Sequence, residues 1–247
     1  MKLWEKIEII TPYPAAYIRE LDAIVIADLH LGYEGIMAEQ GIFVPKVQFE
    51  QEMRTLKSIL EQKDASTIIV CGDVKHEFSE TSYHEFVEVS DFLGFLGERF
   101  DEVLVLKGNH DNYLIRITRK HGAKLFDELE MDDFYFLHGH RAPPSLSKSR
   151  SGYVVMGHEH PSIALFDEVG TKEKVDCFLY GRMKDKRLLV LPAFSTLAGG
   201  SEVNLIPREE LLSPVLREMT NIDELKAVGI SVEVGCLPLP ELWKLKV

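Results

Sequence analysis

Five short apolar runs in this chain are each followed at once by a turn that carries Asp, Asn or His. The runs are four or five residues long and rich in Val, Ile, Leu and aromatic residues, a composition typical of buried strands. They are residues 23–27, 67–71, 102–106, 134–137 and 153–156. Because the same arrangement recurs five times, we expect a fold in which several strands end beside one another.

Amphipathic segments separate these runs and predict an α/β fold. We expect helices over residues 45–62, with Pro45 in the first turn, and over 80–97 and 111–121. After residue 160 the pattern changes to shorter strands with a helical insert. The expected strands are 163–166, 175–180, 187–192 and 230–234, and the insert covers 208–228. We interpret residues 1–247 as a single domain of two packed sheets, in which the tail 231–247 covers either the core or a dimer contact.

The polar turns predict one site at the edge of a sheet. The carboxyl ends of parallel strands share one edge, and α/β proteins bind their ligands there. In chain order the turns read Asp28-Leu29-His30, Gly72-Asp73, Gly108-Asn109-His110-Asp111, His138-Gly139-His140 and Gly157-His158-Glu159-His160. Seven of the nine histidines lie in or just after these turns.

The residue types in these turns favour transition metals. Carboxylates combined with imidazoles suit Mn, Fe or Zn, whereas Mg and Ca prefer shells of oxygen. Taken singly, each motif has an ordinary alternative, since Asp often caps a helix and Gly and Asn are common in turns. Five motifs in order, each at the end of an expected strand, favour a metal site over five unrelated turns.

The composition limits the classes of function. Forty acidic against 28 basic residues give a net charge of −12, which opposes diffuse binding to a nucleic-acid backbone. Bound cations would reverse the local charge at a metal-lined cleft. We expect neither a membrane span nor a signal peptide, because no apolar run is long enough and the N-terminus is charged throughout. Three widely spaced cysteines, Cys71, Cys177 and Cys236, are typical of reduced thiols, and we expect a cytoplasmic protein.

The order D-x-H, G-D, G-N-H-D, H-G-H and G-H-x-H resembles the signature of the calcineurin-like metallophosphoesterase superfamily. The motifs span residues 28–160, about half of the chain. The longer strings DLHLGYE and GDVKHEF are similar to the prokaryotic branch of ICC-like and SbcD-related phosphoesterases. This resemblance implies a four-layer αββα sandwich of two mixed sheets, with two metals at one end of the paired sheets.

The resemblance also implies a role for each residue of the turns. Asp28, His30 and His160 would hold the first metal, and Asp73 would bridge to the second. Asn109, His138 and His158 would hold the second metal. Two divalent ions are implied, with Mn expected and Fe, Zn or Ni as alternatives, and a hydroxide that bridges them would attack phosphorus in line. His110 would protonate the leaving oxygen or stabilise the phosphoryl group. Asp111 would accept a hydrogen bond from the other ring nitrogen of His110, cap a helix, or do both.

The expected substrate contacts are His140, His76, Arg141, Lys148 and Arg150. His140 would touch the substrate phosphate or replace His138 as ligand. His76 would support Asp73 or serve only as a polar residue at the start of a helix. The three cations lie in the segment 141–151, which would form a phosphate-binding lip or an ordinary solvated loop.

The function that follows is a metal-dependent phosphoesterase that hydrolyses phosphodiesters. A nuclease with nucleic acid as its partner is one reading within that class, and a phosphomonoesterase or a small-molecule or cyclic-nucleotide phosphodiesterase is the alternative. The alternative outside the enzymes is a metal-binding scaffold, which predicts missing ligands, whereas here none of the motif residues is missing. A monomer and a homodimer are both open.

Overall fold

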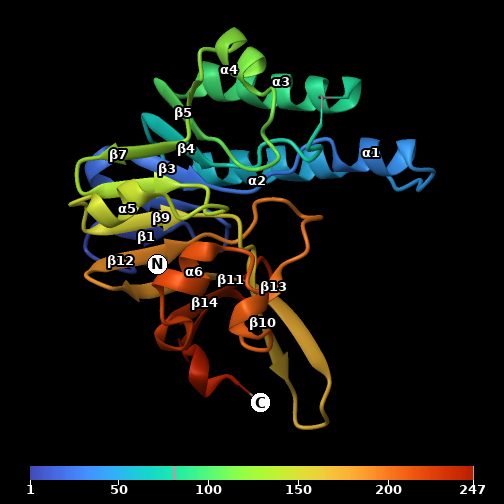
Figure 1. Ribbon diagram of the computed structural model, residues 1–247. Helices are drawn as coiled ribbons and strands as arrows, with labels where there is room; N and C mark the ends of the chain where they lie inside the picture. Colours follow the sequence, from blue (N-terminus) through green and yellow to red (C-terminus); the bar gives the residue numbers. More distant parts are fainter. Residues whose placement is uncertain (80–81, 247) are drawn as a thin grey trace.

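The computed structural model describes residues 1–79 and 82–246, and two mixed β-sheets form its centre (Figure 1). The first sheet has six strands in the order β1-β2-β3-β4-β5-β6. They are β1 (Ile7–Ile9), β2 (Ala16–Ile18), β3 (Ala23–Ile26), β4 (Thr67–Cys71), β5 (Glu102–Leu106) and β6 (Lys124–Phe126). Strands β3 to β6 are parallel, so their carboxyl ends share one edge, whereas β1 and β2 run antiparallel to their neighbours.

The second sheet has nine strands, with β13-β10-β11-β12-β9-β8-β7 as its main path and β14 and β15 joined to β11. They are β7 (Glu128–Met131), β8 (Phe134–Leu137), β9 (Tyr153–Met156), β10 (Pro161–Phe166), β11 (Lys172–Met183), β12 (Lys186–Val190), β13 (Ser201–Glu202), β14 (Lys226–Ser231) and β15 (Gly235–Glu241). Strands β8, β9 and β12 are parallel, and the hairpins around them are antiparallel. The hairpin of β10 and β11 extends away from the rest of the molecule (Figure 1).

Alternation along the buried strands produces four layers. In β4, Ile68 and Val70 pack toward the helices, while Ile69 and Cys71 pack toward the other sheet. In β8, Phe134 and Phe136 face the first sheet. Tyr135 and Leu137, on the opposite face of β8, pack into a third core under the C-terminal helices. Successive side chains of a strand point to opposite faces, so a strand that is apolar throughout is buried on both sides. The predicted αββα sandwich of two mixed sheets is confirmed.

The N-terminal half contains a helix that was not expected from the sequence, α1 (Tyr33–Glu39). Its three expected helices, α2 (Gln48–Gln62), α3 (Tyr83–Arg99) and α4 (Ile115–Lys120), begin later than predicted. Helix α2 begins three residues after Pro45 because Oε1 of Glu34 accepts hydrogen bonds from the backbone amides of Val47 and Gln48 and caps the helix there. The first two residues of the expected helix 80–97 lie outside the described residues. Within the described part of the chain, no helix combines the length and the apolar character that crossing a bilayer requires.

The C-terminal half contains short helices where the insert was expected. They are α6 (Pro214–Met219) and two 3-10 turns, Arg208–Glu210 and Ile222–Glu224, and α5 (Pro144–Lys148) lies further upstream. Residues 226–228, expected to be helical, instead begin β14, and residues 232–234 form the turn to β15 rather than the end of a strand. Strand β15 belongs to the expected tail, and it pairs with β14, so this part of the tail completes a sheet.

Candidate metal centre

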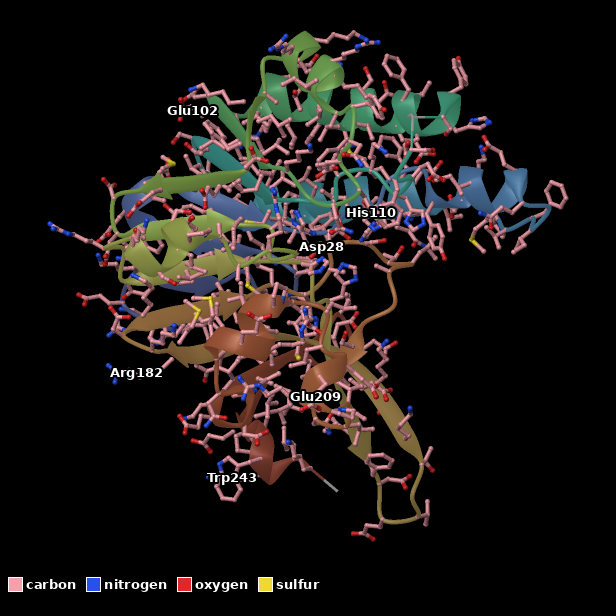
Figure 2. The ribbon with its side chains drawn as sticks, in the orientation of Figure 1. Asp28, Glu102, His110, Arg182, Glu209 and Trp243 are labelled. Atoms are coloured by element: carbon pink, nitrogen blue, oxygen red, sulfur yellow. The ribbon has the colours of Figure 1, made fainter. Side chains whose placement is uncertain are left out.

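The carboxyl ends of five strands bring the polar turns to one place between the two sheets. Asp28 and His30 follow β3, Asp73 follows β4, and Asn109 and His110 follow β5 in the first sheet. In the second sheet, His138 follows β8, while His158 and His160 follow β9. Figure 2 shows Asp28 and His110 close to each other where the sheets end. The sequence therefore predicted correctly which turns converge.

The first potential metal-binding group consists of Asp28, His30 and His160, whose ligand atoms all lie within 4.8 Å of one another. The Nε2 atoms of His30 and His160 are 3.3 Å apart, and His160 Nε2 is also 3.3 Å from Asp28 Oδ1. His160 Nδ1 faces the carbonyl oxygen of Gly199 at 3.3 Å. A proton on Nδ1 would satisfy that carbonyl and leave Nε2 of His160 free for a cation.

The second potential metal-binding group consists of Asp73, His138 and His158, again within 4.8 Å. His138 Nε2 lies 3.2 Å from Asp73 Oδ2 and 3.1 Å from His158 Nδ1. Asn109 Oδ1 is 3.0 Å from the same nitrogen and adds a further oxygen to this group. His138 Nδ1 donates to the carbonyl oxygen of Cys71 at 2.9 Å, so Nε2 is the ring nitrogen that remains for a metal.

Asp73 lies between the two groups. Its Oδ2 is 3.9 Å from His30 Nε2 of the first group and 3.2 Å from His138 Nε2 of the second. The backbone amide of His110 donates to the other oxygen, Oδ1, at 3.0 Å and fixes the orientation of the carboxylate. Of the two carboxylates, Asp73 is thus the one placed to reach both sides of the site.

The donor set fits cations better than it fits a closed network of hydrogen bonds. The facing Nε2 atoms of His30 and His160 both point lone pairs into the space between them unless one is protonated. Among the described residues, the buried Oδ1 of Asp28 has no hydrogen-bond partner. A buried polar atom without a partner costs free energy, and a divalent cation coordinated by carboxylate and imidazole would recover it.

The backbone at this site is strained where the ligands are. Five of the seven potential ligands have a positive φ, which non-glycine residues rarely adopt: Asp28 (59°), His30 (51°), Asp73 (49°), His158 (70°) and His160 (46°). Each left-handed residue costs on the order of 1–3 kcal/mol, and such residues gather at functional sites because the surrounding fold enforces them. Here the tight turns after the strands aim the side chains back into the site instead of along the strand.

Glycines let these strand ends approach one another. A Cβ atom on Gly108 would overlap the carboxylate and the backbone nitrogen of Asp73, and one on Gly72 would overlap the ring of His138. Gly72 also has a φ of 87°, which favours glycine in any case. The glycine beside each ligand is thus explained by close packing within the site.

Burial lowers the pKa of some histidines of the site, and the two carboxylates raise the pKa of others. Burial lowers the pKa of His30 and of His158 to about 3, so both rings are neutral, the form that binds metals. Burial also disfavours charge on His138, but Asp73 and Asp28 outweigh it and raise the pKa of His138 to about 9. For Asp73, burial is likewise outweighed by His138, and the pKa of Asp73 falls well below its usual range. The site therefore contains an ionised carboxylate that attracts positive charge.

The ring of His110 lies beside the second group without belonging to it. Its Nε2 is 3.8 Å from Asp73 Oδ2, and its Nδ1 donates to the carbonyl oxygen of His76. Asp111 does not hold this ring, which corrects the expectation from the sequence. The Asp111 carboxylate instead accepts from the backbone amides of Val74 (2.9 Å) and Gly108 (2.8 Å), and also from that of Lys75 (3.3 Å). Asp111 therefore joins the turn after β4 to the turn after β5.

His76 contributes its backbone rather than a contact from its ring to Asp73. Within the described residues no hydrogen bond joins that ring to Asp73, and its Nδ1 is buried without a partner. The centroid of the His76 ring lies 3.9 Å from that of the Tyr33 ring. One nitrogen of the His76 ring also lies within 4.8 Å of a ring nitrogen of His30 and of a ring nitrogen of His110. The observed role of His76 is therefore to orient His110 through the carbonyl oxygen.

A cavity of about 340 Å³ opens beside the second group. His138, His140 and Arg141 are among its lining residues, together with Asp127, to which Arg141 is paired at 3.4 Å. The ring of His140 lies 5.3 Å from that of His138, and contacts to Asp73 and Asn109 are made by His138, so His138 is the better-placed ligand. Lys148 and Arg150 are exposed at the end of α5 and beyond it, and they do not line this cavity. Among the described residues, Arg141 alone of the three cations in the expected lip lines the cavity.

Sequence reasoning missed a buried ion pair beneath the site. Nζ of Lys75 lies 3.8 Å from Oε2 of Glu85, and both side chains are completely buried. Glu85 also accepts from the backbone amides of His76 and Glu77, and so fixes the loop that carries the His76 carbonyl. Nothing in the sequence around Lys75 distinguishes it from an exposed lysine, because its burial depends on α3 packing over the loop.

This chain is similar to known proteins in sequence and in fold. A family model described as calcineurin-like phosphoesterase matches residues 22–181, more than half of the chain. No protein of curated function matches the sequence significantly. The solved structure of the nuclease MPE of Pseudomonas putida is 20% identical, covers 92% of both chains and has a TM-score of 0.62, which shows a shared fold. The phosphoesterase Yfce of E. coli is 14% identical over 72% of this chain and 83% of its own, with a TM-score of 0.42.

The family match covers the turns after all five strands, from Asp28 to His160, and the fold places those turns at one site. The resemblance stated from the motifs is thereby confirmed. The chain belongs to the calcineurin-like phosphoesterase family and is a hydrolase that acts on ester bonds.

Proposed function

We propose that this protein is a two-metal phosphodiesterase. The observation that carries the proposal is the position of Asp73 between two separate groups of ligands, each drawn from both sheets. Asp28, His30 and His160 would hold one cation, and Asn109, His138 and His158 would hold the other. Two divalent cations, when bound, would lower the pKa of a water molecule and so supply a hydroxide that can attack phosphorus. They would also neutralise negative charge on the phosphoryl oxygens. Mn as the metal, a single domain, the cytoplasm as the compartment and a homodimer as one form of assembly stay predictions.

His110 is the proton donor in this proposal. The His76 carbonyl keeps a proton on Nδ1 of His110, so the proton that is given up must come from Nε2. That nitrogen faces the site, 3.8 Å from Asp73. An imidazole held in this way can give its Nε2 proton to a leaving alkoxide.

A diester is favoured over a monoester by the charge around the site. The net charge is −12, and Asp127 and Glu128 line the cavity beside His138. A phosphomonoester carries more negative charge than a diester and would be repelled more strongly by these carboxylates. The fold shared with the nuclease MPE makes nucleic acid a reasonable diester to test. A monoester or a cyclic nucleotide is the alternative substrate.

The test compares a diester with a monoester on protein stripped of metal. Bis(p-nitrophenyl) phosphate and p-nitrophenyl phosphate are supplied with and without Mn²⁺, and we expect hydrolysis of the diester that depends on Mn²⁺. His110→Ala should lower kcat by roughly 10²- to 10⁴-fold, the usual contribution of a general acid, on a diester with an alkoxide leaving group such as a dinucleotide. The loss should be much smaller on the p-nitrophenyl esters, because p-nitrophenolate leaves without being protonated. Binding of Mn²⁺, measured by calorimetry, should persist in that variant because His110 belongs to neither of the two ligand groups that contain a carboxylate.

His121→Ala is the matched control, since this histidine bonds Ser90 on the surface of the helical layer, away from the strand ends. It should retain the wild-type rate. If neither ester is hydrolysed by protein with two bound metals, the phosphodiesterase proposal is wrong and a scaffold is favoured. A faster reaction with the monoester would favour a phosphomonoesterase.

A further inference from the structure

An exposed aromatic ring covers one side of His110. The ring of Phe78 lies 3.7 Å from that of His110, centroid to centroid, at an angle of 31° between their planes. Phe78 nevertheless remains 54% exposed. The phenyl ring thus covers the imidazole with one side and presents the other to solvent at the edge of the site.

The backbone around Phe78 is held in place by three consecutive carbonyl groups. Buried Lys75 donates through Nζ to the carbonyl oxygens of Glu77 and Ser79, the second at 3.2 Å. The side-chain amide of Asn112 donates to the carbonyl oxygen of Phe78 at 3.1 Å. Because Lys75 is itself buried and faces Glu85, the loop is fixed from inside the protein. A loop that simply left its phenylalanine in solvent would not need this support.

A functional role would explain why the loop holds the exposed ring of Phe78 in a fixed position. The face of the Phe78 ring that is exposed to solvent adds nothing to the stability of the isolated chain, whereas the buried Lys75–Glu85 pair that supports the loop carries a desolvation cost. Preorganised aromatic rings at an opening are typical of surfaces that stack flat ligands, because little conformational entropy is lost on binding.

The position of Phe78 indicates which part of a substrate it would meet. His110 would protonate the leaving oxygen, so a ring stacked on His110 lies on the leaving-group side of the phosphorus atom. In a nucleic acid, the group attached to that oxygen is a nucleoside whose base is a flat aromatic system. Simple alkyl or sugar phosphodiesters offer no such group.

We propose that Phe78 stacks on the base of the nucleotide that leaves, which makes single-stranded nucleic acid the substrate class of this site. The inference rests on the proposed phosphodiesterase function. Double-stranded nucleic acid is excluded as the direct substrate at Phe78, because paired and stacked bases have no free face. The contact is independent of sequence, since every base has a face that can stack.

The test compares a short single-stranded DNA oligonucleotide with an abasic oligonucleotide of the same length and the same number of phosphates. The wild-type protein with Mn²⁺ should cleave the oligonucleotide with bases faster. Phe78→Ala should lower kcat/KM on that substrate by about 5- to 150-fold more than on the abasic oligonucleotide, the range for loss of one base–aromatic stack. Phe78→Trp should retain the preference, and Phe78→Leu should lose it, because only Trp can stack.

Phe166→Ala is the matched control, since Phe166 on β10 is 43% exposed and lies on the hairpin that projects from the molecule. It should behave as wild type on both oligonucleotides. Equal loss of both rates in Phe78→Ala would mean that Phe78 only positions His110, and would overturn the stacking proposal. Equal wild-type rates on both oligonucleotides would also overturn it while leaving the phosphodiesterase function intact. If the wild type cleaves neither oligonucleotide but hydrolyses bis(p-nitrophenyl) phosphate, nucleic acid is not the substrate.

Discussion

Glu52 is an acidic residue in the interior of the helical layer. It lies in α2 and is completely buried. Its Oε1 accepts a hydrogen bond of 2.8 Å from the side-chain amide of Gln48. The same amide contacts the carbonyl oxygens of Leu29 and His30 at 3.0 and 3.2 Å, so α2 supports the turn after β3 through this pair. Burial raises the pKa of Glu52 well above its usual range, and the neighbouring Glu88 and Glu34 act in the same direction. Burial therefore favours the protonated form of Glu52 in the folded protein.

Glu52→Gln should change how the free energy of unfolding depends on pH. A carboxyl whose pKa is raised by folding contributes stability below its unfolded pKa and loses that contribution as the pH rises through its folded pKa. Glutamine keeps the shape and has no charge to bury, so the variant should gain stability relative to wild type as the pH rises from about 5 to about 8. Urea unfolding at both pH values measures the difference.

The matched control for that measurement is Glu50→Gln on the same helix. Glu50 is exposed and paired with Arg54, an interaction worth about 0.3–0.5 kcal/mol. Its pH dependence should follow wild type. Parallel pH profiles for wild type and Glu52→Gln would show that Glu52 does not have the raised pKa.

At the residue level, the sequence was sufficient to predict which residues come together as potential ligands. It was not sufficient to predict how neighbouring side chains are oriented relative to one another. The seven expected ligands come together because each directly follows a strand, and that relation is local. Asp111 was expected to orient His110 because the two are adjacent in sequence. Its actual partners include the amides of Val74 and Lys75, more than 30 positions earlier in the chain, and no local pattern contains that pairing.

At the level of elements, the strand ends are packed closely enough to require glycine. Gly108 follows β5 by one residue, and its amide donates to Asp111 Oδ2 at 2.8 Å while its Cα faces Asp73. Gly108→Ala would force a methyl group into the Asp73 carboxylate. Overpacking of this kind costs typically about 1–3 kcal/mol, and here the displaced group is the carboxylate shared by both ligand groups. We expect lower thermal stability, weaker Mn²⁺ binding and loss of most diesterase activity.

Calorimetry with Mn²⁺ and thermal unfolding without metal measure these effects separately. Gly94→Ala in α3 is the matched control, because the added methyl would lie 3.4 Å from the ring of His121, an ordinary contact, and alanine favours helix. It should bind Mn²⁺ as wild type and unfold at the same or a slightly higher temperature. Wild-type Mn²⁺ binding by Gly108→Ala would show that the turn relaxes without moving Asp73.

The elements that the sequence predicted are those with continuous apolar runs. Strands β3, β4, β5, β8 and β9 are buried on both faces, and all were expected within one residue of their observed bounds. Strands β1 and β2 have three residues each and β15 contains Pro238 and Pro240, so periodicity gives no clear signal for them. Strands β1 and β2 are recognised through their pairing with each other and with β3, and β15 is recognised through its pairing with β14. The start of α2 was missed for a similar reason, because its cap comes from Glu34 in another helix.

At the level of the whole molecule, the site links the two sheets. Asp28, His30, Asp73 and Asn109 come from the first sheet, and His138, His158 and His160 come from the second. Each potential ligand group contains residues of both sheets, so a bound cation would connect them across the interface. The net charge of −12 makes the folded chain repel itself, and two divalent cations would reduce that repulsion at the most crowded point.

Addition of Mn²⁺ to metal-free protein should therefore raise the unfolding temperature. A ligand present at 100 times its Kd stabilises the native state by about 2.7 kcal/mol per site. For a chain of this size, that corresponds to a rise in the unfolding temperature of about 5–10 °C for each site. Asp73→Asn should lose most of the rise because this carboxylate faces both ligand groups. His84→Ala should keep it in full, since His84 is an exposed histidine on α3. An equal rise for wild type and Asp73→Asn would place the cations elsewhere on the acidic surface, and no rise in the wild type would rule out a metal that couples the two sheets.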